Sequence, residues 1–148
     1  MSYKGKYRVK FPGKYKGNPN DVTYRSGMEL KMFNFFDLHS DVLEWGSEIE
    51  IVKYRSPIDG RIHRYFIDLY AKIKKKDGTE QVLLIEVKPE KQSRPPVKKS
   101  RVTRRYIMEV KTWGVNQAKW EAASAYAAKR GWTFVVMTEK DISGLTGF

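Results

Sequence analysis

Two segments in which apolar and polar side chains alternate constrain the fold of this 148-residue chain more than any other feature. In residues 65–73 and 83–88 every odd-numbered position is apolar, a pattern typical of β-strands with one face on a core. The Asp77-Gly78 pair between them is typical of a hairpin turn. The two segments are therefore predicted to pair as antiparallel strands.

The shared core selects the register of this hairpin. A two-residue Asp77-Gly78 loop would place the two apolar sets on opposite faces, because side chains alternate along each strand. A three-residue loop with Gly78 in the left-handed conformation pairs Lys75 with Thr79 and brings both sets to one face. We therefore predict the three-residue loop.

The predicted register places Asp68 opposite Glu86 on the second face, with Lys88 two residues further along it. Two carboxylates about 4 Å apart repel by about 4 kcal/mol at an effective dielectric near 20, so such a pair shares a proton or holds a cation. The alternative is a solvated ladder in which Lys72 and Lys88 simply neutralise the two acids.

Composition limits which cation could bind. The chain has no cysteine and only two histidines, His39 and His63, which excludes disulfides, thiol nucleophiles, zinc fingers and iron–sulfur clusters. Carboxylates remain as the plausible protein ligands. Ligation by oxygen alone points to Mg²⁺ or Mn²⁺.

The net charge indicates the class of partner. Lys and Arg number 29 against 17 Asp and Glu, a balance of +12, in a chain that is 41% hydrophobic and so expected to fold. Such a field attracts polyanions, nucleic acid first and an anionic membrane surface second. No apolar run exceeds four residues, so no membrane-spanning segment is expected and the protein should work where it is made.

The remaining patterns predict an α/β (α+β) fold. Residues 1–24 form a basic arm whose aromatic side chains, spaced every four residues, either stack on bases or pack along the domain edge; residues 25–148 form a single domain. A capping box at Ser26 and Glu29 starts a helix that ends near Leu38. The other predicted elements are strands at 42–45, 48–54, 61–74, 81–88 and 132–137, a loop at 89–100, and a helix at 101–130 that ends at Gly131.

The acidic motif in this α-β-β-β-α-β order resembles the PD-(D/E)xK nuclease superfamily. Asp68 is followed after seventeen residues by Glu86-Val87-Lys88, although Ile67 replaces the proline of the family name. The wider pattern resembles the head-completion nucleases of tailed phages over nearly the whole chain. Its motifs are Tyr24-Arg25-Ser26 before Glu29, Tyr54-Arg55-Ser56-Pro57, His63-Arg64-Tyr65-Phe66, Ile85-Glu86-Val87-Lys88-Pro89 and Val115-Asn116-Gln117-Ala118-Lys119-Trp120.

The resemblance implies a restriction-endonuclease-like core, a central mixed sheet flanked by helices. It further implies that Asp68, Glu86 and the Val87 carbonyl bind Mg²⁺, which Mn²⁺ can replace. Lys88 would orient or activate the attacking water, and Glu29 would complete a catalytic group of acids. The capping box gives Glu29 a structural role as well, and the two roles are compatible.

DNA contacts are expected around this site. Arg94 belongs to a cationic run between the Glu-x-Lys strand and the long helix, which is either a solvated face or a DNA backbone contact. Gln117 interrupts an apolar stripe of that helix, formed by Val102, Tyr106, Val110, Trp113, Trp120 and Ala127. The predicted DNA-binding residues are Arg25, Lys98, Lys99, Arg101, Arg104, Arg105, Gln117 and Lys119. No base-reading motif is present, so little sequence preference is expected.

These observations predict a Mg²⁺-dependent deoxyribonuclease, a phosphodiester hydrolase that acts on DNA in phage head completion and head–tail joining. It would work in the host cytoplasm during assembly, with the virion as a second location, and with portal or neck proteins as further partners. One alternative is a noncatalytic DNA-binding or neck-assembly protein. Another is a related nuclease, such as a transposase cutting subunit or a junction resolvase.

Overall fold

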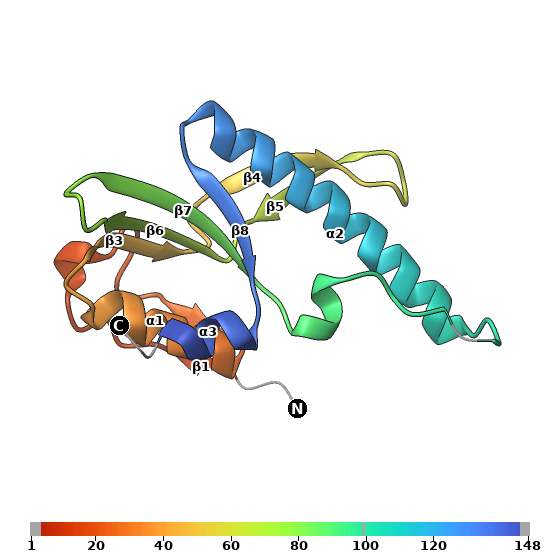
Figure 1. Cartoon of the computed structure of the whole chain (residues 1–148), viewed down its shortest axis with the longest axis horizontal. Helices are drawn as coiled ribbons and strands as arrows, with labels where there is room; N and C mark the ends of the chain where they lie inside the picture. Colours follow the sequence, from red (N-terminus) through yellow and green to blue (C-terminus); the bar gives the residue numbers. More distant parts are fainter. Residues whose placement is uncertain (1–3, 99, 146–148) are drawn as a thin grey trace.

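A mixed four-stranded sheet lies at the centre of the computed structural model, which describes residues 4–98 and 100–145 (Figure 1). Its strand order is β3-β6-β7-β8. These strands are β3 (Val42–Ser47), β6 (Leu69–Lys74), β7 (Glu80–Val87) and β8 (Thr133–Met137). β6 pairs antiparallel with β3 and β7, whereas β8 runs parallel to β7. The predicted fold class is confirmed.

The β6–β7 hairpin has the predicted register. Leu69 lies opposite Ile85, and the Lys75 amide donates to the Thr79 carbonyl at 2.8 Å, which closes the three-residue loop. Gly78 has a φ of 87°, a conformation that a residue without Cβ adopts without strain. The three-residue turn is therefore the one that allows both sets of apolar side chains to pack in the same core.

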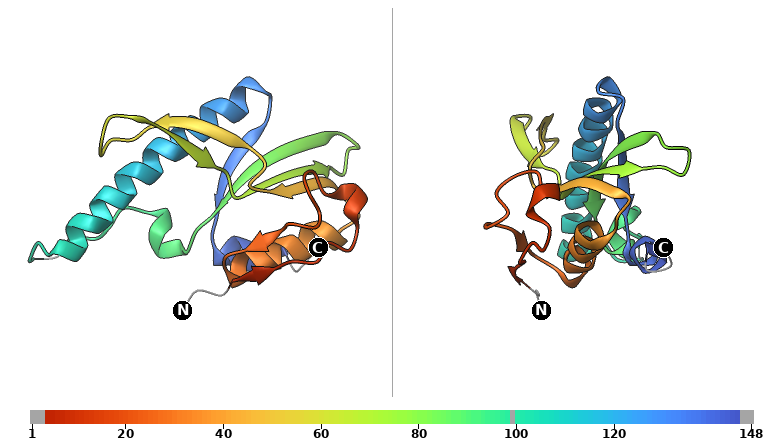
Figure 2. Two further views of the ribbon diagram at one scale, coloured as in Figure 1. Left: turned by 180° about the vertical axis from the view of Figure 1, so that it is seen from behind. Right: turned by 90° about the vertical axis from the view of Figure 1, so that its left-hand side faces the viewer.

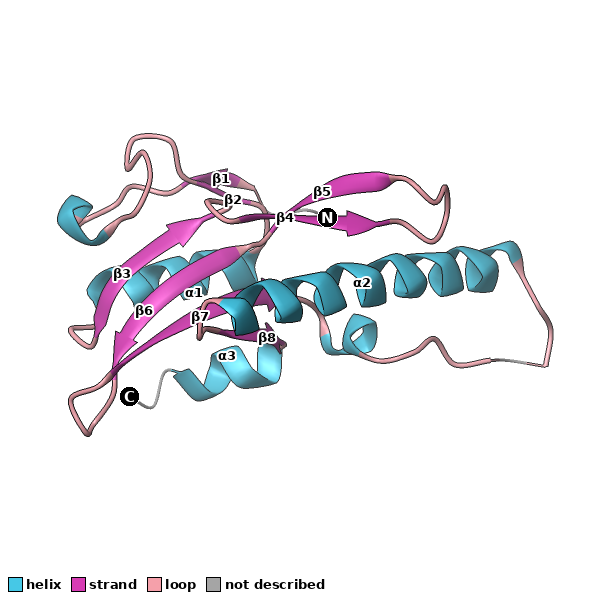
Figure 3. Cartoon of the chain, turned by 90° about the horizontal axis from the view of Figure 1, so that it is seen from above, coloured by secondary structure: helices cyan, strands magenta, loops and turns pink. Residues whose placement is uncertain are grey.

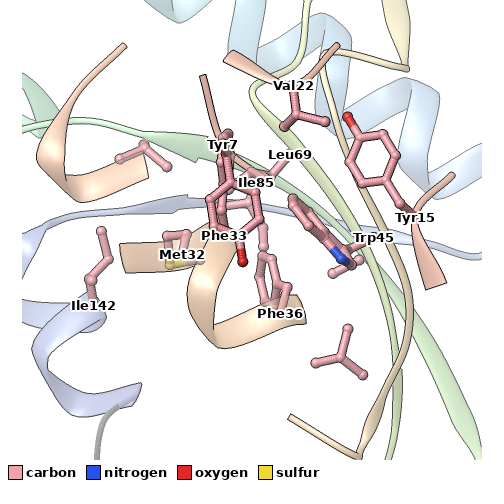
Figure 4. Close-up of a cluster of buried hydrophobic side chains, with 13 residues drawn as sticks. Tyr7, Tyr15, Val22, Met32, Phe33, Phe36, Trp45, Leu69, Ile85 and Ile142 are labelled. Carbon is pink, nitrogen blue, oxygen red and sulfur yellow. The ribbon is translucent and has the colours of Figure 1, made fainter. Parts of the chain in front are cut away.

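The odd-numbered face of this hairpin packs on a core that includes α1 (Gly27–Leu38). The helix α3 (Glu139–Leu145), which the sequence did not predict, adds Ile142 to the same core. Figure 4 shows Phe33, Trp45 and Ile142 among its side chains. The start and end of α1 are as predicted, and the Ser26 hydroxyl accepts from the Glu29 amide at 3.1 Å.

The even-numbered face is buried too, against a second core. It is covered by α2 (Arg104–Lys129) and by a separate two-stranded ribbon of β4 (Ile51–Arg55) and β5 (Ile62–Phe66), as Figure 2 shows. Tyr70 and Leu84 of the sheet pack there with Ala123 and Ala127 of α2. The central strands β6 and β7 are thus enclosed on both sides over most of their length.

The prediction of one continuous strand over 61–74 is wrong, because the chain changes pairing partner between β5 and β6. At this break the Ile67 amide donates to the Glu50 carbonyl at 3.0 Å, and the Glu48 amide donates to the Asp68 carbonyl at 3.1 Å. Tyr65 and Ile67 consequently pack in the second core and not in the first. Asp68 itself sits in the break.

The N-terminal segment packs onto the same core as α1. It contains β1 (Gly5–Lys6), the 3₁₀ helix η1 (Pro12–Lys14) and β2 (Thr23–Tyr24). Tyr7 and Tyr15 are buried, in agreement with the packing alternative for the aromatic side chains. Phe11 remains 51% exposed, and the Tyr3 position lies outside the described residues.

The long helix α2 differs from its prediction in its first half. It begins at Arg104, where Thr103 caps it, and the C-terminal Gly131 has the expected positive φ of 72°. The apolar stripe does not hold throughout: Val102, Val110 and Gln117 are exposed, while Asn116 takes a buried position. The predicted loop before α2 contains a short 3₁₀ helix, η2 (Glu90–Ser93).

Within the described part of the chain, no helix has the length and apolarity needed to cross a bilayer.

Candidate active site

Asp68 and Glu86 face each other at the point where β6 begins and β7 ends. Leu69, the first residue of β6, pairs with Ile85, and Asp68 and Glu86 are the next residues beyond this last pair of the two strands. The Val87 amide donates to Oδ2 of Asp68 at 2.8 Å, which fixes that carboxylate against the end of β7. Strand pairing therefore holds the two acids together, as the sequence predicts.

Glu86 is only 6% exposed and has two polar partners. The hydroxyl of Tyr65 donates to Oε2 of Glu86, and the ammonium of Lys88 lies 3.5 Å from Oε1. Burial and the neighbouring Glu86 both raise the pKa of Tyr65, so its hydroxyl keeps the proton that it donates. Lys119 of α2 lies 5.4 Å from the centre of the Tyr65 ring, a cation–π contact that holds the ring from behind.

Asp68 lacks comparable compensation. The pKa of Asp68 is raised from 3.8 to about 8, first by burial and then by the charges of Glu86 and Glu29. The Val87 amide and the charge of Lys88 oppose it without cancelling it. A carboxyl that resists ionisation for these reasons gains most from a cation placed between the acids.

Glu29 has the predicted capping contact and lies near the acid pair. Its amide is capped by Ser26, while its own Oε1 accepts from the Arg25 amide at 3.1 Å, so the reciprocal capping bond reaches the residue before Ser26. Burial raises the pKa of Glu29, and the charges of Glu48 and Glu86 add to the effect, against the influence of Arg25. Glu29 is therefore within electrostatic reach of the Asp68/Glu86 pair.

Arg25 and Glu48 form an ion pair near Glu29 and Asp68. The Arg25 guanidinium is 2.6 Å from Oε1 of Glu48, and this bond raises the pKa of Arg25. Glu48 has a φ of 54°, in the left-handed region that a non-glycine residue seldom occupies. Its amide bonds to the carbonyl of Asp68, so the unusual backbone belongs to the break that positions that acid.

The solvated-ladder alternative does not describe this arrangement. Lys72 lies 3.3 Å from Glu80, at the far end of β7, and not beside the two acids. Glu86 is buried, and among the residues that the structure describes Lys88 is the cation that forms an ion pair with it. Burial of an incompletely compensated acid pair is unfavourable unless the site gains a ligand.

The donor set fits a hard divalent cation. Among the residues that the structure describes, no group of three His, Cys, Asp or Glu side chains is arranged to hold a metal ion. Asp68 and Glu86 would thus supply two ligands, with the predicted Val87 carbonyl and water completing the shell. Mg²⁺ characteristically binds through one or two carboxylates and retains several waters, so the pair suits it.

The predicted DNA-binding residues fall into three sets. Arg25 and Lys119 lie beside the acids or beside Tyr65, whereas Gln117 is exposed on α2. The cationic run lies along the loop and the outer end of α2, which project away from the sheet (Figure 3). Its described members are exposed, namely Lys98, Arg101, Arg104 and Arg105, while Lys99 lies outside the described residues.

Sequence reasoning missed Tyr65 and Glu48. Tyr65 was assigned to the apolar set of its strand, although a buried tyrosine hydroxyl usually requires a polar partner. That requirement was the available signal, and Glu86 satisfies it. No comparable local pattern marks Glu48, because its contact with Arg25 joins segments that are distant in sequence.

The sheet order and the position of the acids within it place the chain among the restriction-endonuclease-like nucleases. Within that class the chain belongs to the family of TnsA-like endonuclease N-terminal domains, which matches residues 39–139. The matched range includes Asp68, Glu86 and Lys88 and leaves Glu29 outside.

A comparison over the full length agrees with this assignment. The chain is similar to the head completion nuclease of Enterobacteria phage T4, with 38% identity over 149 residues that cover 98% of this chain and 97% of that protein. No solved structure shows significant similarity. The resemblance to head-completion nucleases that the motifs predicted is confirmed.

Proposed function

We propose that the chain is a Mg²⁺-dependent nuclease that hydrolyses DNA phosphodiester bonds with little sequence preference. The observation that carries this proposal is the pair formed by the partly buried Asp68 and the buried Glu86, whose mutual repulsion Lys88 offsets only in part. Family membership supports nuclease chemistry at this pair. When bound, Mg²⁺ supplies a Lewis acid that polarises the phosphate and makes hydroxide available near neutral pH.

The side chains of the site then have distinct tasks. Asp68 and Glu86 hold the cation, with the Val87 carbonyl as a third ligand, and Tyr65 fixes the rotamer of Glu86 through its hydrogen bond. Lys88 orients the attacking water and stabilises the negative charge that develops on the phosphate. Glu29 serves as an additional acid beside the pair, and Arg25 lies where it can meet a neighbouring phosphate.

We further propose a role in phage head completion and head–tail joining, where the nuclease would act on packaged DNA. Similarity to the T4 head completion nuclease over nearly the whole chain supports this role. The host cytoplasm during assembly, or the virion itself, would be the place of action, and portal or neck proteins the further partners.

Cleavage of supercoiled plasmid DNA tests the enzymatic proposal. We expect nicking in Mg²⁺ or Mn²⁺, no nicking in EDTA, and loss of nicking in Glu86→Gln. Glu80→Gln is the matched control, because Glu80 is an exposed acid on the same strand, paired with Lys72 and remote from the pair. Binding of plasmid without cleavage in any divalent cation would refute the enzyme and favour a noncatalytic DNA-binding protein.

A further inference from the structure

The ribbon of β4 and β5 has one covered face and one open face. Its inner side chains, Val52, Tyr54 and Tyr65, are buried in the core beneath α2. The outer side chains form three cross-strand pairs. These pairs are Ile51 with Phe66, Lys53 with Arg64, and Arg55 with Ile62.

The outer face is both apolar and cationic. Ile62 is 55% exposed and Phe66 42% exposed, and the three basic side chains are exposed as well. None of the six outer residues is acidic. Asp59, in the turn, lies 2.7 Å from His63, so it offsets none of the three positive charges directly. Clustered exposed apolar residues of this kind usually mark an interaction surface.

The ribbon is continuous with the candidate active site. Phe66 precedes Asp68 by two residues, and its neighbour Tyr65 points inward to bond Glu86. The Arg64 guanidinium lies 5.6 Å from the centre of the Phe66 ring, which holds a phosphate-binding group beside an aromatic surface. The ribbon therefore connects its outer face, through the chain itself, to the strand break that carries Asp68.

We propose that the outer face of the β4–β5 ribbon binds duplex DNA by entering the major groove. Lys53 and Arg64 contact phosphates, and Phe66 and its apolar neighbours pack against base edges and sugars. The major groove, about 12 Å wide, admits a two-stranded ribbon. Strands of five residues extend over roughly 17 Å at about 3.3 Å per residue, enough to follow the groove. This inference rests on the proposed nuclease function and names how its substrate is held.

Titration of a fluorescein-labelled 20-base-pair duplex in EDTA, over a range of salt concentrations, tests the ribbon. For Lys53→Ala combined with Arg64→Ala we expect affinity to fall about tenfold or more at low salt. The slope of log affinity against log salt should decrease by about 1.8, from two phosphate contacts at about 0.9 each.

The matched control removes the same charge elsewhere. Lys74 and Lys76 lie at the β6–β7 turn, at the opposite end of the molecule from the ribbon (Figure 1), and both are exposed. Lys74→Ala combined with Lys76→Ala should leave the salt slope almost unchanged. If the ribbon and control variants lose equal affinity, the ribbon inference is wrong, even though the unmodified chain binds and cuts DNA.

Two other outcomes are equally decisive. If the unmodified chain neither binds nor cuts the duplex, the proposed function and the ribbon inference fail together. If sedimentation shows a dimer that only the ribbon variant dissociates, and DNA affinity matches the control, the ribbon is a contact between copies and not a DNA site.

A labelling experiment provides a test that keeps the outer charges largely in place. Because the chain has no cysteine, Lys53→Cys carries a single thiol for an environment-sensitive fluorophore. The duplex should change the emission of this label and not that of a label on Lys76→Cys. Equal responses at both positions, or none at position 53, would overturn the inference.

Discussion

One buried and one partly buried aspartate of this chain have opposite surroundings. Asp37, at the end of α1, is 0% exposed and accepts hydrogen bonds from the Tyr7 hydroxyl at 2.7 Å, the Lys10 amide at 2.7 Å and the Phe11 amide at 3.1 Å. Asp68 accepts one amide bond and faces another acid, Glu86. The Asp37 carboxylate is therefore stabilised by three hydrogen-bond donors of the protein. The Asp68 carboxylate has one such donor and would be stabilised by a nearby positive charge.

The difference separates a structural acid from a candidate catalytic acid. The donors around Asp37 belong to the N-terminal segment, so this carboxylate fastens residues 7–11 to α1. The acids around Asp68 raise its pKa and leave the pair short of a cation. Burial alone therefore does not reveal function, but burial without adequate donors indicates a site that binds something.

The largest expected effect comes from Asp68→Asn. We expect plasmid nicking in Mg²⁺ to fall by about 10³-fold or more, because the site loses a ligand of a cation that supplies several kcal/mol of transition-state stabilisation. The free energy of unfolding at pH 7 without metal should rise by about 1 kcal/mol or more, since at this pH the unmodified chain must take up a proton at Asp68 in order to fold. Asp41→Asn, at an exposed acid, is the control and should change neither quantity. Retained nicking would exclude Asp68 from the metal site.

The same substitution at the other aspartate should have the opposite consequence. Asp37→Asn places an amide group among three donors and leaves at least one of them without an acceptor. We expect the free energy of unfolding, measured by urea denaturation, to fall by about 3 kcal/mol. Nicking should remain near normal at temperatures where the variant is folded. A variant as stable as the unmodified chain would remove the contrast between the two acids.

Tyr65→Phe tests whether the candidate site depends on the hydrogen bond to Glu86. Loss of an outer partner of a metal ligand typically costs about 10- to 100-fold in metal affinity or activity, so we expect a higher Mg²⁺ requirement and slower nicking. Tyr54→Phe is the control, because its ring lies under the same Lys119 without a bond to the acids. If both variants show the same Mg²⁺ requirement, Tyr65 serves only to fill the core.

The β6–β7 hairpin and the start of α1 could be predicted because their signals are local. The parity of apolar positions and Gly78 select one register, and Ser26 with Glu29 marks a helix start. The register of the hairpin by itself brings Asp68 and Glu86 together. The catalytic and DNA-binding roles of the predicted residues remain predictions.

The contrast between the two aspartates depends on contacts that no local pattern records. The donors to Asp37 come from residues 26 to 30 positions away along the chain. The strand break at Asp68 contains neither glycine nor proline, and it arises because β5 pairs with β4 while β6 pairs with β3 and β7. Burial of the acids under α2 and the ribbon likewise follows from tertiary packing.

The last expected effect is a dependence of stability on pH, which the raised pKa of Asp68 should produce. Asp68 has a higher pKa in the folded chain, about 8, than the ordinary 3.8, so the folded state binds the extra proton between these values. Stability without metal is then greatest at low pH within this window and falls as pH rises toward 8. Burial raises the pKa of Glu29 and acts in the same direction.

Urea denaturation in EDTA from pH 5 to pH 8 measures this dependence. The free energy of unfolding should fall by up to about 1.4 kcal/mol per pH unit for the proton held by Asp68. The acids whose pKa is lowered, Asp21, Asp59 and Asp77, titrate below this range and leave the slope alone. Asp68→Asn should flatten the slope and Asp77→Asn should preserve it. An equal slope in both variants would mean that the proton is held elsewhere and that the Asp68/Glu86 pair is already compensated.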